Sequence, residues 1–448
     1  MEVVQLIPSL GNLVLTIAAF IVVLLVIVAI HEFGHYIVGY WSGIHAEVFS
    51  IGFGPTLFSR VDRKGTTWRL AAVPLGGFVQ FAGDIDAASS PDSEAIAQMS
   101  PAERRRTLPG APLWARTATI VAGPMFNFVT AIILFAAITV FQGEARDPLT
   151  VGSLRDLPEG SYQLLSGDQI VAINGIDMPA SGGLGSFGLI IDGLPTAQTL
   201  DYSIIRNGER RVVAGPQLFP PLISSVVPRS AAADAGLRPD DVIMSVDRNP
   251  IFSFEQLRNA VIGSGGESLD LEVWRDDQVL SLAIAPRKTE EIEEDGSFQS
   301  YWRIGLAPAL AFEPATQLIS PIIALWDATL LTGRVISDSL VGLYAILTGV
   351  ISSCNLSGVI GIAEASGSMA SQGFMSFLWF IAFLSVAIGL VNLFPIPVLD
   401  GGHLLFISYE AIVGRPPNAM VSRVLMGIGL TLIVGLMIFA IGNDIFCP

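Results

Sequence analysis

Long apolar runs with almost no charged residue are the dominant pattern along the chain. An α-helix of about 20 apolar residues crosses the ~30 Å hydrocarbon core of a bilayer. Runs of this kind occupy residues 13–30, 118–141, 374–394 and 421–441. The third run ends at Pro395 and Pro397, which a helix interior does not accommodate. We therefore predict a membrane core of four transmembrane helices.

A fifth segment, residues 317–347, is apolar but interrupted by charges. Asp327, Arg334 and Asp338 occur in it at roughly helical spacing. Such a pattern favours an amphipathic helix on the membrane surface over a span. We expect residues 313–373 to form this surface segment.

Two other regions show the alternation typical of strands. Residues 46–55 and 56–83 predict short strands, with a hairpin turn at residues 62–65. Residues 166–175 and 239–248 are an internal repeat, since each holds a turn, an acidic residue and an alternating apolar strand. Arg248 replaces the glycine seen at Gly175, which puts only that turn in doubt. The repeat predicts two α+β modules.

The composition fits a membrane protein. Hydrophobic residues make up 51% of the 448 residues and charged residues 14%, against about 25% in ordinary soluble domains. The mean hydropathy is +0.60. The net charge of −16 argues against a nucleic-acid partner, because phosphate binding needs clustered Lys and Arg. Cys354 and Cys447 indicate no disulfide framework and no thiolate metal site, and would pair only if both face an oxidising compartment.

The basic residues predict how the spans are oriented. The loop between the first two spans holds seven of them from residue 60 to residue 106, and Arg415 lies between the last two spans, whereas both termini lack Lys and Arg. Cytoplasmic loops carry an excess of these residues. We therefore place both loops in the cytoplasm and both termini, with residues 142–373, outside. No basic segment precedes the first apolar run, so we interpret it as a retained span and not as a signal peptide.

These patterns divide the chain into nine parts. They are a first transmembrane helix (1–42), a cytoplasmic or reentrant β-loop and connector (43–112), a second transmembrane helix (113–141), two outside modules (142–225 and 226–312), the surface segment (313–373), a third transmembrane helix (374–402), a cytoplasmic link (403–420), and a fourth transmembrane helix with its tail (421–448).

The end of the first span carries candidate metal chemistry. His31 and His35 are spaced i, i+4, which places both imidazoles on one face of a helix, with Glu32 beside them as a general base. Catalytic zinc usually takes three protein ligands and a water. Asp400 is the best-placed third ligand, because the first and third spans both end on the cytoplasmic side. Ionisable groups at this depth are costly and usually serve a function.

Three motifs resemble the site-2 protease family of intramembrane zinc metalloproteases, in particular the bacterial RseP (regulator of sigma-E protease) type. They are His31-Glu32-Phe33-Gly34-His35, Gly123-Pro124-Met125-Phe126-Asn127, and the stretch 392–401 that contains Asn392 and Asp400. The resemblance implies that His31, His35 and Asp400 bind Zn²⁺ and that Glu32 activates a zinc-bound water. It also suggests that Asn392 holds the substrate backbone, while Gly123, Pro124 and Asn127 are expected to be structural.

Further substrate contacts are expected from two backbone features. Pro395 and Pro397 free main-chain groups near Asp400. Gly76, Gly77 and Phe78 lie in the β-loop, whose strand edge could take an unwound substrate by β-augmentation. The resemblance implies a membrane-reentrant β-loop near the active site. The alternative is a cytoplasmic hairpin that only packs on the spans.

Residues 230–243, SAAADAGLRPDDVI, resemble a bacterial PDZ domain, so the two outside modules are expected to be PDZ-like. They would either bind extracytoplasmic peptides or exclude large substrates, and the resemblance implies a size filter.

The resulting hypothesis is a multi-pass endopeptidase of the bacterial inner membrane with its active site near the cytoplasmic face. The implied substrates are single-span membrane proteins, such as a trimmed anti-sigma factor of a stress response, and remnant signal peptides. Two other hypotheses remain. A scaffold with structural zinc would not need Glu32, and a metal transporter would call for more intramembrane carboxylates and histidines than the sequence holds.

Overall fold

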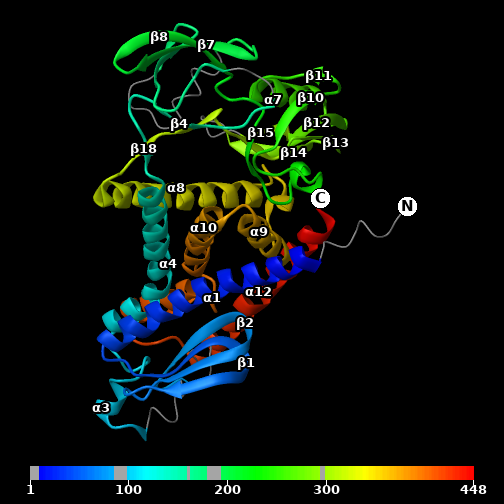
Figure 1. Cartoon of the computed structure of the whole chain (residues 1–448). Helices are drawn as coiled ribbons and strands as arrows, with labels where there is room; N and C mark the ends of the chain where they lie inside the picture. The colour runs from blue at the N-terminus through cyan, green and yellow to red at the C-terminus, as the bar shows by residue number, and fades with distance from the viewer. Residues whose placement is uncertain (1–9, 85–97, 159–161, 179–192, 293–297, 448) are drawn as a thin grey trace. The chain divides into compact units, whose positions relative to one another are not determined.

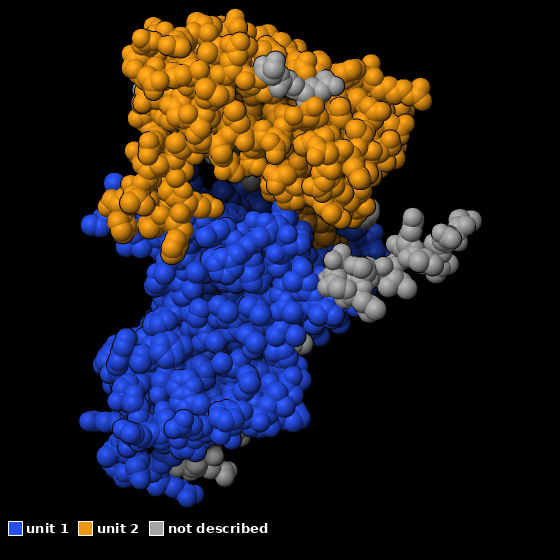
Figure 2. Space-filling view, in the orientation of Figure 1, with its two compact units in different colours: residues 1–138, 322–349, 353–448 blue, residues 139–321, 350–352 orange. Residues whose placement is uncertain are grey.

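The computed structural model describes residues 10–84, 98–158, 162–178, 193–292 and 298–447. The chain divides into two compact units, which Figure 2 distinguishes by colour. Unit 1 comprises residues 1–138, 322–349 and 353–448, and unit 2 comprises residues 139–321 and 350–352. Part of the expected connector, residues 85–97, lies outside the described residues.

Unit 1 is built on long apolar helices. Among the described residues, five are long and apolar enough to cross a membrane: α1 (Leu10–Trp41), α4 (Leu113–Gln142), α8 (Pro321–Thr348), α10 (Phe374–Asn392) and α12 (Ala419–Phe446). The shorter helices are α3 (Pro101–Arg104), α9 (Val359–Ser371), α11 (Asp400–Val413) and a 3₁₀ turn, η3 (Ser353–Asn355). Four spans are predicted from the sequence, and α8 is the additional candidate.

Helix α8 differs from the other four in its arrangement. Figure 1 shows it running crosswise at one end of α4 and α10, not alongside them. Its buried residues include Ala324, Ala328 and Thr332, which share one face, whereas Asp327, Arg334 and Asp338 are exposed. A helix with a charged flank and a large exposed apolar surface has the character of an interfacial helix.

Helices α1, α9 and α10 pack together in the core of unit 1. Val23 and Ile27 of α1 meet Phe380, Ile381 and Leu384 of α10 in one buried cluster. A methyl group added at Gly367 of α9 would lie 2.2 Å from the hydroxyl oxygen of Thr16, so the two helices approach closely there. This packing fixes α1, which carries the histidine motif, against α10.

A β-hairpin follows α1. Strands β1 (Ala46–Val61) and β2 (Thr67–Phe81) are joined by the turn that the sequence predicts at residues 62–65. Asp62 accepts hydrogen bonds from the Trp68 indole and from the Lys64 and Thr66 main chain. Burial alone would raise the pKa of Asp62, but these hydrogen bonds hold it below its ordinary value. The carboxylate therefore fixes the turn.

The pairing within the hairpin leaves one edge of β2 open. Residues 48–51 of β1 pair both with residues 77–80 and with residues 67–70 of β2. Residues 77–81 have no second strand partner within the described chain. Phe81 already hydrogen-bonds Asp84 through both its N–H and its carbonyl, and the Val79 main chain hydrogen-bonds Glu32. The other main-chain groups on the outer edge of residues 77–80 are available to another extended segment.

Unit 2 contains two modules with the same strand order. The first has β5 (Gln169–Ile173), β6 (Ile176–Asp177), β7 (Thr199–Arg206) and β8 (Glu209–Pro216), in the order β6-β5-β7-β8. The second has β10 (Val242–Val246), β11 (Asn249–Pro250), β12 (Leu269–Arg275) and β13 (Gln278–Ile284), in the order β11-β10-β12-β13, with helices α6 (Ala231–Asp234) and α7 (Phe254–Gly263). The remaining strands form two-stranded sheets: β3 (Glu144–Ala145) with β18 (Thr316–Gln317), β4 (Val151–Leu154) with β17 (Phe312–Pro314), β9 (Ile223–Val226) with β16 (Leu306–Pro308), and β14 (Arg287–Ile292) with β15 (Phe298–Arg303).

The second module is inserted into the first, which corrects the expected boundaries. Strand β17 pairs with β4, and Leu310–Phe312 belong to the first core together with Leu164 and Tyr202. Ile223 and Val226 belong instead to the second core. Pattern alone could not reveal this, because a strand of three residues carries too little periodicity to be assigned to either module.

The repeat extends to a buried ion pair in each module. Arg206 contacts Asp168 at 2.6 Å in the first, and Arg275 contacts Asp241 at 2.6 Å in the second. Both carboxylates also accept a main-chain hydrogen bond at 2.8 Å, from Leu165 and Arg238. The turn at Arg248 takes the same left-handed conformation, φ 65°, that Gly175 takes at 79°.

A group of contacts joins the C-terminal end of α12 to the start of α9, and we call it the C-terminal clasp. Cys354 and Cys447 form a disulfide with their Cα atoms 5.6 Å apart. Asp444 accepts hydrogen bonds from the main-chain N–H groups of Gly358 and Gly361, and Asn443 donates to Ser353 O. From the sequence, the pairing was expected only if both cysteines face an oxidising compartment, and the 93 residues between them do not show that they lie close together.

Candidate metal centre

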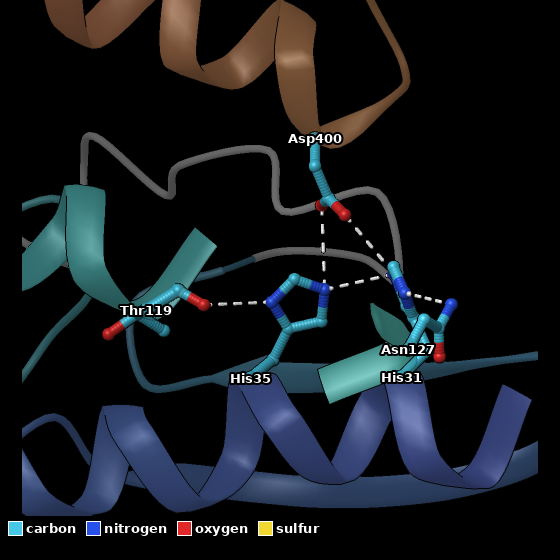
Figure 3. Close-up of polar contacts among 5 residues, drawn as sticks. All are labelled: His31, His35, Thr119, Asn127 and Asp400. Carbon is cyan, nitrogen blue, oxygen red and sulfur yellow. Dashed lines mark hydrogen bonds and ion pairs between the residues drawn. The ribbon is translucent and has the colours of Figure 1, made fainter. Parts of the chain in front are cut away.

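The three predicted ligands meet at the end of α1. His31 and His35 project from one face of α1, and Asp400 reaches them from the first residue of α11 (Figure 3). The two Nε2 atoms are 3.2 Å apart, and the Asp400 oxygens lie 3.1 Å from His31 Nε2 and 3.4 Å from His35 Nε2. One ligand atom from each residue lies within 4.8 Å of the others, so a single cation can bind all three.

Helix α4 orients both imidazoles. His35 Nδ1 donates to Thr119 O at 2.9 Å, so the proton of the neutral ring is on Nδ1 and the lone pair of Nε2 faces the other ligands. The Asn127 side-chain amide lies 3.3 Å from His31 Nδ1. The atom nearest the ring is the amide nitrogen Nδ2. Metal binding through Nε2 puts the His31 proton on Nδ1, and the amide would then be turned so that Oδ1, which has no other partner, accepts it. Hydrogen bonds of this kind fix the tautomer of metal-binding histidines.

Glycine 123 makes room for the site between these two contacts. A methyl group added there would lie 2.3 Å from His35 Nε2 and 2.9 Å from His31 Cε1. Thr119, Gly123 and Asn127 are spaced by four, so they share one face of α4. This face supplies an acceptor for one ring, space for both and a polar partner for the other.

Asp400 is held by a tight loop after α10. Methyl groups at Gly401 and Gly402 would lie 2.2 Å from Phe394 O and 2.4 Å from Ile396 O, so only glycine allows the loop to close on the start of α11. Val398 has φ 93°, a conformation that a β-branched residue rarely adopts and that marks local strain. Helix α12 supports the loop, since a methyl at Gly429 would lie 2.0 Å from Pro397 O.

These residues fit zinc. Two imidazole nitrogens and a carboxylate oxygen are a common donor set for catalytic zinc, and they leave a coordination position open. The lone pairs of the two Nε2 atoms and the carboxylate face one another at 3.1–3.4 Å, an arrangement that a cation between them stabilises.

A cavity of about 380 Å³ adjoins the ligands. Glu32 lines it, and so do the predicted substrate residues Asn392, Gly77 and Phe78. Pro395, Pro397 and Gly76 are not among its described lining residues. The two prolines shape the loop that carries Asp400, and Gly76, with φ 130°, lets the ring of Phe53 approach it.

Several lining residues were not predicted from the sequence. They are Phe53, Val79, Phe81, Leu108, Thr119, Ile120, Val398, Leu399 and His403. The strand residues Phe53, Val79 and Phe81 bring the open edge of β2 to the cavity. From the sequence, His403 was expected to be an interfacial group or a neighbour of the ligands and not a ligand itself; it follows Asp400 by three residues and so shares its helix face.

Comparison with known proteins agrees with this geometry. The model of peptidase family M50 matches residues 19–436. A protein of Agrobacterium fabrum, named as a proposed zinc metalloprotease, is 35% identical over 96% of this chain and 95% of its own length. A Rhizobium meliloti protein with the same kind of name is 34% identical over 97% of this chain and 98% of its own length. The metalloprotease MmpA of Caulobacter vibrioides is 33% identical over 94% of this chain and 93% of its own length.

A PDZ domain from an SdrC-like protein of Listeria monocytogenes covers 21% of this chain and 92% of its own at 19% identity, with a TM-score of 0.17 that carries no argument. The family match spans nearly the whole chain, and the long apolar helices make the molecule a multi-pass membrane protein. The protein belongs to peptidase family M50 and is a zinc metalloprotease.

Proposed function

We propose that the protein is an intramembrane endopeptidase, which cleaves single-span membrane proteins near the cytoplasmic face of the bacterial inner membrane. The observation that carries the proposal is the position of the ligand cluster. His31, His35 and Asp400 lie on or directly beyond helices that are long and apolar enough to span a bilayer, next to a cavity lined by Glu32. Ionisable groups at such depth usually serve a function.

The side chains around the cavity divide the work of hydrolysis. Zinc, when bound by His31, His35 and Asp400, supplies a Lewis acid that polarises the scissile carbonyl. Glu32 takes a proton from the attacking water, and that proton passes to the amine nitrogen as the C–N bond breaks. The Asn392 amide faces the same cavity and can hydrogen-bond the main chain of the substrate.

The open edge of β2 is the proposed docking strand. A substrate helix must unwind before its peptide bond is accessible, and its freed main-chain groups then need partners. Residues 77–80 offer such partners beside the cavity, and a methyl at Gly77 would lie 3.0 Å from Cγ of Glu32. Proline along residues 77–80 removes main-chain donors from this edge, so cleavage should be lost while zinc content stays normal; Val79 is left unchanged because its main chain hydrogen-bonds Glu32. Unchanged cleavage would refute this docking mode.

We propose that α8 lies on the outer membrane surface and does not cross. Both α1 and α10 end at the metal site, so they run through the bilayer in the same direction, and α4 returns between them. If α8 also crossed, α10 would run the opposite way and Asp400 would be on the far side from His31. Helix α9, at 13 residues or about 20 Å, is too short to restore the direction.

The orientation that follows places both termini and unit 2 outside. It can be tested by labelling an Asp338→Cys variant with a membrane-impermeant maleimide in right-side-out vesicles. Rapid labelling is expected, because the native cysteines are paired and Asp338 is exposed. Protection equal to that of a cysteine placed in α10 would argue for a spanning α8.

We propose that unit 2 is a PDZ-like pair that admits only trimmed substrates, such as an anti-sigma factor shortened outside the membrane, and remnant signal peptides. The insertion of the second module permits a clean deletion, since Ala309 N donates to Leu222 O at 3.0 Å. Joining residues 222 and 309 removes the second module and keeps β17 with the first core. Cleavage should then depend less on trimming, whereas unchanged discrimination would favour peptide binding over exclusion.

The proposal as a whole is tested by a paired measurement. The unaltered chain and Glu32→Gln are purified, zinc per chain is determined, and each is incubated with a trimmed single-span peptide in detergent micelles. Zinc in both, with cleavage only by the unaltered chain, is expected. Zinc in both without cleavage of any trimmed substrate would favour a non-catalytic scaffold.

A further inference from the structure

A third histidine lies at the cavity and takes no part in the mechanism described above. His403 lines the same cavity as His31, Glu32, His35 and Asp400. It follows Asp400 by three residues in α11, so both side chains project from one face of that helix, with Cβ atoms about 5–6 Å apart. The first turn of α11 therefore presents one metal ligand and one imidazole to the cavity.

The ring of His403 is free to bind a substrate. Within the described chain its ring nitrogens have no hydrogen-bond partner, and the ring contacts Phe406 edge-on at 6.4 Å between centroids. The other polar groups in the cavity wall are already used. Thr119 Oγ1 donates to Ala115 O, and the nitrogens of His31 and His35 are occupied by metal binding or by partners on α4.

The ring of His403 is half-buried in the cavity wall and has no polar partner in the described chain, so it is available to a ligand that enters the cavity. A purely structural role does not account for this imidazole, because the ring makes no polar contact that would position Asp400. Among the described residues that line the cavity, Asn392 is the other amide or imidazole donor without a hydrogen-bond partner. The cavity thus has two donors that can act on substrate.

We propose that His403 is a catalytic residue that donates a hydrogen bond from its imidazole N–H to the scissile carbonyl oxygen. As the water oxygen bonds to the carbonyl carbon, the π electron pair moves onto the carbonyl oxygen, and His403 stabilises the negative charge that develops there. When the C–N bond breaks, the pair returns to re-form the carbonyl, and the proton taken up by Glu32 goes to the amine. This inference rests on the proposed peptidase function.

The test compares inhibitors that differ in the state they imitate. A phosphinic peptide carries a tetrahedral, negatively charged group at the scissile position, whereas a hydroxamate peptide of the same sequence binds mainly through the metal. In His403→Ala, we expect kcat to fall by about 10²–10³ with KM within threefold, and the Kd of the phosphinic peptide to rise by a similar factor. Zinc per chain and the Kd of the hydroxamate should stay unchanged.

Three further variants separate a catalytic from a structural role. His403→Gln keeps an N–H donor and should recover part of the phosphinic affinity, while His403→Phe keeps the ring volume and should behave like His403→Ala. His45→Ala, at the histidine that does not line the cavity, is the matched control and should match the unaltered chain.

Equal loss of both inhibitors, or loss of zinc in His403→Ala, would overturn the proposal by assigning His403 a structural role. Unchanged kcat and phosphinic affinity would overturn it as well. If the unaltered chain binds both inhibitors but cleaves no substrate, the proposed function fails, and the inhibitor comparison still decides the role of His403.

Discussion

The sharpest test of the metal centre is Gly123→Ala, which adds a single methyl group. That methyl would lie 2.3 Å from His35 Nε2, 2.5 Å from His35 Cε1 and 2.9 Å from His31 Cε1. Carbon atoms and ring atoms pack at about 3.5–4.0 Å, so the His35 ring must move by more than about 1 Å. Zinc–nitrogen distances tolerate only about 0.2 Å, so the ligand cannot stay in place.

The expected magnitude follows from these distances. Overpacking a well-filled site costs about 1–3 kcal/mol. Since each 1.4 kcal/mol is a tenfold change in an equilibrium constant, the zinc Kd should rise by about 10- to 100-fold. The helix itself should not suffer, because alanine is preferred over glycine in a helix interior by about 1 kcal/mol. The variant therefore separates the metal site from the stability of α4.

The assay is a competitive zinc titration against a chromophoric chelator, with far-ultraviolet circular dichroism as a check on helix content. Gly427→Ala is the matched control, because it adds the same methyl in α12 with no atom within 4 Å, and its zinc affinity should be unchanged. A Gly123→Ala protein with the zinc affinity of the control would show that the site has more space than these distances allow, and the reasoning would fail.

Three further predictions concern the contacts around the site and the clasp. Asn127→Ala should raise the zinc Kd by about 10- to 100-fold. Asn127→Asp keeps an acceptor for His31 Nδ1 and should leave the zinc Kd unchanged. An equal rise in both variants would contradict the role assigned to Asn127. Cys354→Ser opens a 93-residue covalent loop and should lower the free energy of unfolding by about 2–4 kcal/mol, measured by thermal unfolding in detergent; a reductant should shift only the unaltered chain. Arg275→Met leaves the buried Asp241 unpaired and should cost about 3 kcal/mol in unit 2, which urea unfolding of that unit can measure; an unchanged midpoint would mean that the carboxylate finds another partner.

Features that local chemistry determines were mostly predictable from the sequence. The sequence singles out the i, i+4 histidines, Glu32 and Asp400, because each combines an unusual residue type with a position at the end of a span, and the structure brings them to one cavity. The hairpin turn at residues 62–65 was predicted for the same reason, since its residues have strong local preferences. These features depend on few neighbours.

Features that depend on distant parts of the chain were not predicted. The insertion of one module into the other rests on Leu310–Phe312, which are too few to show a period. The disulfide joins cysteines whose proximity follows only from the packing of α12 against α9. A surface position for α8 is predicted from its charges and stays a proposal, whereas its crosswise direction relative to α4 and α10 required the structure (Figure 1).

The motif at residues 123–127 shows why metal ligands are easier to predict from sequence than the groups that orient them. Gly123 and Asn127 were interpreted as structural, because a glycine and an amide in a span commonly serve helix packing. In the structure they are part of one face of α4 that touches both metal-binding rings. Thr119 acts there through its main-chain carbonyl, a group that every residue has, so no side-chain pattern could mark it. The same face would be needed whatever substrate is cleaved. The strand edge and His403 are proposed to act only on a bound substrate, so zinc affinity and inhibitor selectivity can test the two sets of residues separately.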